Sequence, residues 1–97
     1  MPTWEAAQRF LHDFEKLTPE QQIRARAAIQ RFIADLRGGQ GFRPGLRVKR
    51  VRGAEGVFEM TWAPDGRATF QFGASVRGGE PHIIWRRIGT HDIFTDA

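Results

Sequence analysis

The 97-residue chain contains no cysteine, asparagine or tyrosine, and only two of its fifteen basic residues are lysine. The absence of cysteine excludes disulfides, catalytic thiolates and cysteine-ligated metal sites. Without asparagine there is no N-glycosylation site. The apolar runs are a few residues long, too short to span a membrane as a helix, and the first residues lack the basic and then apolar pattern of a secretory signal. We therefore expect a soluble, cytoplasmic protein.

Basic residues are concentrated in one segment. The net charge is +4, but residues 43–52, with the sequence RPGLRVKRVR, hold five cations and no anion. We call this segment the cationic strip, and a strip of this kind attracts the phosphate backbone of nucleic acids. A second interpretation is that the arginine content follows from genome base composition and that the strip is a solvated edge.

The first part of the chain has the periodicity of two helices. From Thr3, which is a suitable N-cap, apolar residues recur at steps of three and four. Thr18 begins the second helix, with Pro19 in its first turn and Gln21 three residues after the cap. Gly38-Gly39 ends it, because glycine adopts the left-handed conformation without strain. The apolar stripes are Ala7, Phe10, Leu11, Phe14 and Leu17 in the first helix and Ile23, Ala27, Ile29, Phe32, Ile33 and Leu36 in the second.

Residues 46–88 change to a period of two, which is typical of strands. Four segments, 46–51, 57–62, 67–72 and 82–88, are rich in β-formers and are separated by turn residues. Their short connections favour antiparallel pairing. We therefore predict one domain with an α+β fold. An N-terminal helical hairpin (4–37) packs on one face of a four-stranded antiparallel sheet (46–88), and a C-terminal tail (89–97) follows.

Alternation along each strand predicts which side chains point away from the helices. The apolar residues that face the helices are Leu46, Val48, Phe58, Met60, Trp62, Ala68, Phe70 and Phe72. The opposite face then collects Arg47, Lys49, Glu59, Thr61, Arg67 and Gln71. In the last strand, burial of Trp85 places Arg86 on this polar face and Arg87 near the rim of the helical layer. His91 and Phe94 follow the flexible Gly89 and come close to the same face.

The predicted polar face suits metal-independent RNA cleavage, in which a ribose 2′-hydroxyl attacks the adjacent phosphate. Glu59 is the candidate base and His91 is the candidate acid, since histidine is the residue type most often used for proton transfer near neutral pH. Arg67 and Arg86 are candidates for holding the phosphate and stabilising its developing charge. The candidate RNA-binding residues are Arg47, Lys49, Arg50, Arg87 and Phe94, the last by base stacking. No metal or other cofactor is expected, because the three histidines lack ligand spacing.

Each of these residues also has a structural interpretation. Glu59 can pair with Arg67 across the strands, and His91 can be a turn residue bonded to the backbone. Phe94 can plug the core, and the strand arginines can be solvated. Together, however, the candidates converge on one face of the predicted sheet, and this convergence indicates a site.

Arranged in this way, the chain resembles the RelE/ParE superfamily of toxins from toxin–antitoxin systems over most of its length. The resemblance is carried by Gly45-Leu46-Arg47-Val48-Lys49, Gly56-Val57-Phe58-Glu59-Met60, Asp65-Gly66-Arg67-Ala68 and the ending from Trp85 to Phe94. It implies a small RNase that cuts mRNA in the ribosomal A site and is neutralised by a co-encoded antitoxin. The Glu, Arg and His set of the YoeB-like branch is similar to Glu59, Arg67 and His91.

Three features depart from the family pattern. Many members begin with a strand, for which residues 1–3 are too short. The terminal aromatic is often tyrosine, whereas here it is Phe94, and the lysine-rich surface of RelE itself is absent. Acid–base chemistry therefore rests on Glu59 and His91, since arginine does not readily release a proton.

The leading hypothesis is a toxin that acts as an mRNA endonuclease, dependent on the ribosome. Its expected partners are a cognate antitoxin, mRNA and the ribosome, with no membrane and no small-molecule ligand. Two alternatives are a ParE-like inhibitor of DNA gyrase, which needs no acid–base pair, and a catalytically inactive module that binds RNA or other proteins.

Overall fold

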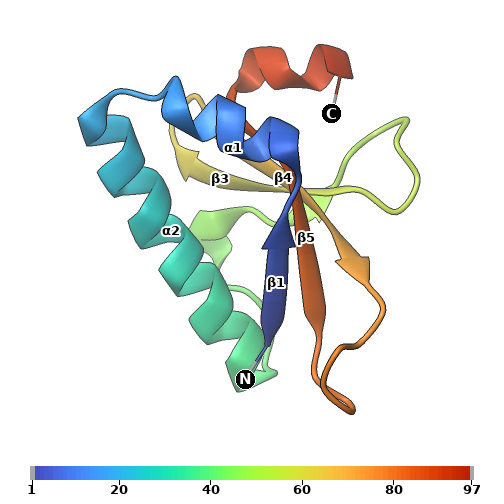
Figure 1. Ribbon diagram of the computed structural model, residues 1–97. Coiled ribbons are helices and arrows are strands. Elements are labelled where there is room, and N and C mark those ends of the chain that lie inside the picture. Colours follow the sequence, from blue (N-terminus) through green and yellow to red (C-terminus); the bar gives the residue numbers. More distant parts are fainter. Residues whose placement is uncertain (1, 97) are drawn as a thin grey trace.

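A computed structural model describes residues 2–96 as an α+β fold with five strands in one sheet. In chain order the elements are β1 (Thr3–Ala6), α1 (Gln8–Glu15), α2 (Pro19–Gly38), the 3-10 helix η1 (Pro44–Leu46), β2 (Lys49–Arg50), β3 (Phe58–Ala63), β4 (Gly66–Gly73), β5 (His82–Thr90) and the 3-10 helix η2 (His91–Asp96). The strand order is β1-β5-β4-β3-β2 (Figure 1). The predicted fold class is confirmed, but the sheet has one strand more than predicted.

The additional strand is β1, at the edge of the sheet. The sequence predicts a helix from residue 4, yet Thr3–Ala6 pair in parallel with β5, and Thr3 N donates to Pro81 O at 3.0 Å. Helix α1 therefore begins at Gln8. The predictions of a hairpin from residue 4, of no preceding strand and of a purely antiparallel sheet are wrong. Residues 3–6 form a strand because the edge of β5 offers unpaired backbone N–H and C=O groups. The periodicity of residues 3–6 alone contains no information about this distant strand.

Helix α2 begins and ends where the sequence predicts. Gln21 N donates to Thr18 Oγ1 (3.2 Å) and Thr18 N donates to Gln21 Oε1 (2.9 Å), which forms a complete capping box. Gly39 ends the helix in the left-handed conformation, with φ of 72°. These signals act within a few residues, so the rest of the chain does not alter them.

The strand predicted for residues 46–51 is reduced to the two residues of β2. Pro44 starts η1, a 3-10 turn that includes Leu46, and Arg47 follows it in the left-handed conformation with φ of 46°. Regular alternation therefore begins only at Lys49. The predicted orientation of Arg47 from strand parity is wrong, because Arg47 is not in a strand.

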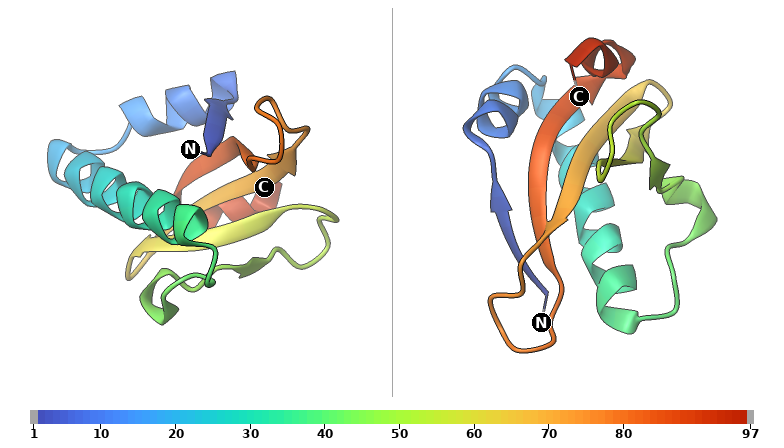
Figure 2. Two further views of the ribbon diagram at one scale, coloured as in Figure 1. Left: turned by 90° about the horizontal axis from the view of Figure 1, so that it is seen from below. Right: turned by 90° about the vertical axis from the view of Figure 1, so that its right-hand side faces the viewer.

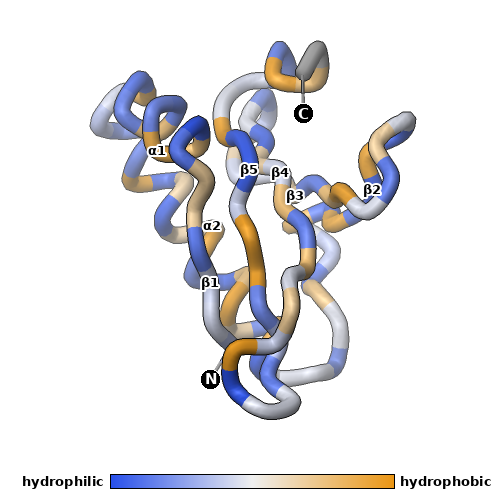
Figure 3. Tube along the Cα trace, turned by 45° about the vertical axis from the view of Figure 1, so that its right-hand side comes forward, coloured by the Kyte–Doolittle hydropathy of each residue, from blue (hydrophilic) through white to orange (hydrophobic). Residues whose placement is uncertain are grey.

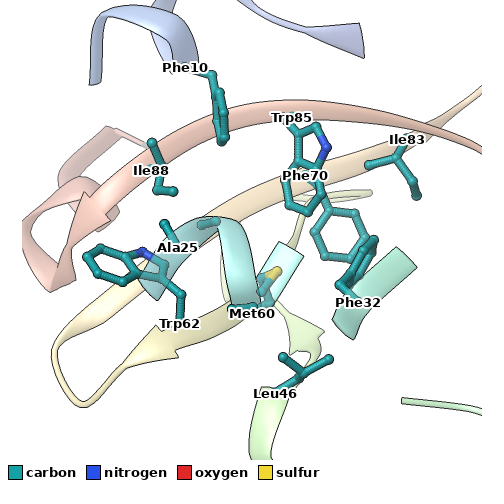
Figure 4. Packing of buried hydrophobic residues seen from close by; sticks show 12 residues of the cluster. Phe10, Ala25, Phe32, Leu46, Met60, Trp62, Phe70, Ile83, Trp85 and Ile88 are labelled. Atoms are coloured by element: carbon teal, nitrogen blue, oxygen red, sulfur yellow. The ribbon is translucent and has the colours of Figure 1, made fainter. Parts of the chain in front are cut away.

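The core forms where α1 packs on β5 and α2 packs on β3; Figure 2 gives two further views of this arrangement. Phe32 of α2 meets Phe70 of β4 (4.8 Å between ring centroids) and Trp85 of β5 (5.1 Å), and Phe10 of α1 meets Trp85 (5.8 Å). Figure 4 shows these side chains together. Of the helices within residues 2–96, none has the length and hydrophobicity needed to cross a membrane.

Three apolar residues predicted to face the core are exposed. The hydrophobic stretch of β5, orange in Figure 3, lies between β1 and β4, and Ile83 and Trp85 of this strand are buried. In contrast, Leu11, Ile23 and Phe72 are 51%, 66% and 46% exposed. These three side chains lie outside the interface between the helices and the sheet, although they follow the apolar pattern of their elements.

Candidate active site

Glu59 lies on the face of the sheet turned away from α1 and α2, which we call the outer face. It pairs with Lys49 of β2 and Thr69 of β4. Its Oε1 is 4.0 Å from Lys49 Nζ and 4.0 Å from Arg67 Nε, and the residue is 8% exposed. The predicted alternation of β3 holds, because the neighbouring Met60 is fully buried in the core. The structure therefore confirms that Glu59 and Arg67 share a face.

The Arg67 guanidinium is held in place by the turn that precedes it. Its Nη1 donates to the carbonyls of Ala63 (3.3 Å), Pro64 (3.2 Å) and Gly66 (2.9 Å). The Trp62 indole donates to Arg67 O at 3.0 Å, and the Arg67 side chain is 17% exposed. A cation with this many fixed partners is preorganised, which is the property that transition-state stabilisation requires.

A bulge in β5 decides where Arg86 points. The residues on either side of Arg86 pair with successive residues of β4, Thr69 and Phe70, so Arg86 is the extra residue. Its Nη1 donates to Gln71 Oε1. Gln71 belongs to the outer face by alternation along β4, and Arg86 therefore joins this face as predicted.

Arg87 is held by α1. Its Nε and Nη2 are 2.6 and 3.2 Å from the Asp13 carboxylate, which also accepts a hydrogen bond from Ile88 N at 3.2 Å. Asp13 and Arg87 are 10% and 16% exposed at the side chain. Arg87 thus ties the helical layer to β5, close to the rim position predicted for it, and its role in RNA binding stays a prediction.

His91 and Phe94 lie in the tail that follows β5. Gly89 pairs with Arg67, and His91 begins η2 two residues later. The His91 and Phe94 rings are in contact, with centroids 4.9 Å apart. His91 is exposed, and among residues 2–96 no hydrogen bond or ion pair joins it to Glu59 or Arg67. The structure therefore brings the predicted base and arginine together and places the predicted acid on an adjacent segment.

The cationic strip does not form a single surface. Lys49 is on the outer face beside Glu59, whereas Arg50 is on the opposite face, with its guanidinium carbon 5.8 Å from the centre of the Phe58 ring. Arg47 is exposed in the turn after η1. Arg43 precedes η1 and Arg52 lies in the turn after β2, so the strip cations are spread over both faces and the adjoining turns.

Arg43, the first cation of the strip, is paired with Asp35 at the end of α2. Its Nε and Nη2 both lie 2.8 Å from the Asp35 carboxylate, and its backbone N donates to the same group at 3.0 Å. These hydrogen bonds lower the pKa of Asp35 from 3.8 to about 2. The charge of Arg43 is therefore already balanced within the protein.

Asp13 is the residue near the site that sequence reasoning missed. Nothing distinguishes it from the other acidic residues of the helical segment. A signal for the bulge was present, because Trp85 and Ile88 are separated by two arginines. Strict alternation would bury either Trp85 or Ile88 but not both, whereas one extra residue between them allows both to face the core.

The arrangement offers one carboxylate and several cations, with an imidazole on the next segment. Such a set can accept a proton from a hydroxyl and stabilise negative charge on a phosphate. Within the part of the chain that the structure describes, no three His, Asp or Glu side chains come together as a metal site requires.

No protein-family model and no curated protein matches this chain. Solved structures match it over most of its length. A copper-bound mutant toxin from Helicobacter pylori is 16% identical, with 95% of this chain and 97% of that chain covered and a TM-score of 0.68. A chain of the Escherichia coli DinJ–YafQ toxin–antitoxin complex is 14% identical, with 94% and 93% covered and a TM-score of 0.64.

A third match is the RelB–RelE antitoxin–toxin complex from Methanococcus jannaschii, at 16% identity, with 94% of each chain covered and a TM-score of 0.60. The protein therefore has the fold of RelE-like toxins. At these sequence identities the similarity establishes the fold alone, and the function of the protein depends on the chemistry of its own site.

Proposed function

We propose that this protein is the toxin of a toxin–antitoxin system and that it inhibits translation by cutting mRNA on the ribosome. The observation that carries the proposal is the position of the Glu59 carboxylate, 4.0 Å from both Arg67 Nε and Lys49 Nζ on the outer face. The fold supports it, since the similar solved structures include toxins from three organisms.

The proposed reaction is an internal transfer at phosphorus. Glu59 takes the proton of a ribose 2′-hydroxyl, and the 2′-oxygen attacks the adjacent phosphate. The O2′–P bond forms while the P–O5′ bond breaks, and the 5′-oxygen receives a proton from His91 in its charged form. The products are one fragment with a 2′,3′-cyclic phosphate and one with a 5′-hydroxyl.

The cations of the outer face stabilise the charge that develops on the phosphate. Arg67 is fixed by three carbonyls of its own turn, and Arg86 is directed by the bulge and by Gln71. Guanidinium groups offer paired donors that match two phosphate oxygens. Lys49 adds a mobile positive charge, since its side chain is 69% exposed.

The tail supplies the acid and a stacking surface. Phe94 is half-buried and holds its ring against His91, so a base stacked on Phe94 lies beside the imidazole. Ile93, which is 6% exposed, packs against Gly89 opposite Arg67. This contact holds η2 against β5, the strand that pairs with β4, which carries Arg67.

We also propose a cognate antitoxin as the regulating partner. The similar solved structures include complexes of a toxin with its antitoxin. An acidic segment of the antitoxin on the outer face would be attracted by Lys49, Arg67 and Arg86 and would cover Glu59. Such charge complementarity mainly raises the association rate.

The proposal is tested with purified protein and ribosomes that carry a defined mRNA. The wild type is expected to create new mRNA ends with a 5′-hydroxyl. Glu59→Gln keeps the size of the side chain and removes the base, so cleavage should fall at least about 100-fold. The matched control is Glu20→Gln, an exposed substitution on α2, which should cleave as the wild type does.

Two outcomes contradict the proposal. If the Glu59→Gln variant cuts at the wild-type rate, Glu59 is not the base. If the wild type arrests growth in cells without new mRNA ends and instead accumulates gyrase–DNA complexes, the protein is a gyrase inhibitor.

A further inference from the structure

An aromatic cluster with an adjacent arginine lies on the inner face of the sheet, the face that the helices cover elsewhere. Phe72 is 46% exposed, and its ring lies 5.5 Å from that of Phe58, measured between centroids. The Arg50 guanidinium carbon is 5.8 Å from the centre of the Phe58 ring. We call Arg50, Phe58 and Phe72 the aromatic edge.

The two rings of the aromatic edge are held rigidly because they pack against the core. Phe70 is fully buried under Phe32 of α2, and its ring is 5.6 Å from Phe58 and 5.8 Å from Phe72. Phe72 is the next inward position along β4 after Phe70, and α2 leaves it uncovered. In Figure 1 the hairpin between β2 and β3 extends away from α2. The two outer rings are therefore held in position and remain accessible.

The charge around the aromatic edge is positive. Arg50 is exposed, as is Arg52 two residues later in the hairpin, and Glu55 is the acidic residue of the hairpin. A purely apolar partner would have to remove these cations from water without pairing them, which is unfavourable. A ligand with flat rings and negative charges satisfies both the aromatic and the cationic groups.

We propose that the aromatic edge is a second RNA subsite, at which Phe72 stacks an unpaired base and Arg50 binds the phosphate next to it. This inference rests on the proposed function for the identity of the ligand as RNA. The edge strand β2 connects the two sites, since Lys49 pairs with Glu59 on the outer face and Arg50 pairs with Phe58 on the inner face. A strand of RNA that passes Lys49 turns around this edge strand, passes Arg50 and Phe58 of β3, and reaches Phe72 on β4.

The test measures the binding of a 12-nucleotide single-stranded RNA in which every 2′-hydroxyl is methylated. Methylation blocks the attacking oxygen, so binding is observed without cleavage. Phe72→Ala and Phe72→Leu are expected to raise the Kd about 5- to 100-fold, because both remove the stacking surface, whereas Phe72→Trp should retain the wild-type Kd. The control is Val76→Ala, at an apolar residue that is 69% exposed and outside the aromatic edge.

The arginine is tested by salt dependence. Each phosphate contact contributes about 0.7 to the slope of log K against log salt for single strands. Arg50→Ala should reduce the slope by about this amount, while Phe72→Leu and the control Arg24→Ala on α2 should leave it unchanged. Thermal unfolding of each variant confirms that it is folded at the temperature of the assay.

The inference is overturned if Phe72→Ala and Phe72→Leu bind the RNA as the wild type does, or if the wild type does not bind it. It is also overturned if Phe72→Leu keeps the wild-type Kd while Phe72→Ala loses it, because an apolar contact is then sufficient. Since the probe cannot be cut, failure of the nuclease proposal is detected separately by mapping mRNA ends.

Discussion

At the scale of single residues, Gly66 makes the position of Arg67 possible. A Cβ at residue 66 would lie 2.5 to 2.8 Å from ring atoms of Trp62. The indole closes over the turn because glycine has no side chain there, and it then donates to Arg67 O. The same turn carries the carbonyls that hold the Arg67 guanidinium.

Gly66→Ala should therefore destabilise the protein, by about 1–3 kcal/mol, because the indole and the turn must move apart. The measurement is urea unfolding followed by tryptophan fluorescence. Gly45→Ala is the matched control, since an added Cβ there meets no atom within 4 Å. Equal unfolding midpoints for the two variants would show that the turn accepts the methyl group without strain.

At the scale of elements, the contact between Asp35 and Arg43 connects the end of α2 to the segment that leads into η1. The carboxylate accepts two guanidinium bonds and one backbone bond. Its pKa is lowered from 3.8 to about 2, mainly by the side-chain hydrogen bond from Arg43. A lowered pKa in the folded state means that the ionised form stabilises the fold.

The stabilisation is complete above the unfolded-state pKa of Asp35 and is lost as the pH falls from about 4 to about 2. Thermal unfolding should therefore show a higher Tm for the wild type than for Asp35→Asn at pH 6, and the difference should shrink toward pH 2. Asp65→Asn, at an exposed turn residue, should show a smaller change over the same range. A difference between wild type and Asp35→Asn that is constant with pH would contradict the assignment.

At the scale of the whole molecule, the sheet is completed by segments from opposite ends of the described chain. His82 of β5 is 7% exposed and lies between two residues of β1. Its Nδ1 is 2.7 Å from Thr3 Oγ1 and its Nε2 is 2.7 Å from Glu5 Oε1. These side-chain contacts add to the parallel backbone pairing and hold β1 on the edge of the sheet.

Replacing His82 with alanine should loosen β1 before the rest of the fold. Amide hydrogen exchange of Thr3–Ala6 is expected to become about tenfold faster, while amides in the centre of β3 and β4 change less. His12→Ala, an exposed substitution on α1, is the control. Unchanged exchange in β1 would mean that the backbone ladder holds this strand without the imidazole.

Features that depend on neighbouring residues were predictable from the sequence. The capping box at Thr18, the glycine that ends α2 and the strands β3, β4 and β5 are examples. The shared face of Glu59 and Arg67 was predictable for the same reason, since it follows from alternation in two strands joined by a short turn.

The sequence by itself thus determined the α+β class and the centre of the candidate site. The tertiary structure alone decided the pairing of β1, the ion pair of Arg87 with Asp13 and the exposure of Phe72. Each of these depends on which segment, distant in sequence, lies beside the residue in the folded protein and pairs with it or covers it. Periodicity and capping act over a few residues and carry no information about that choice.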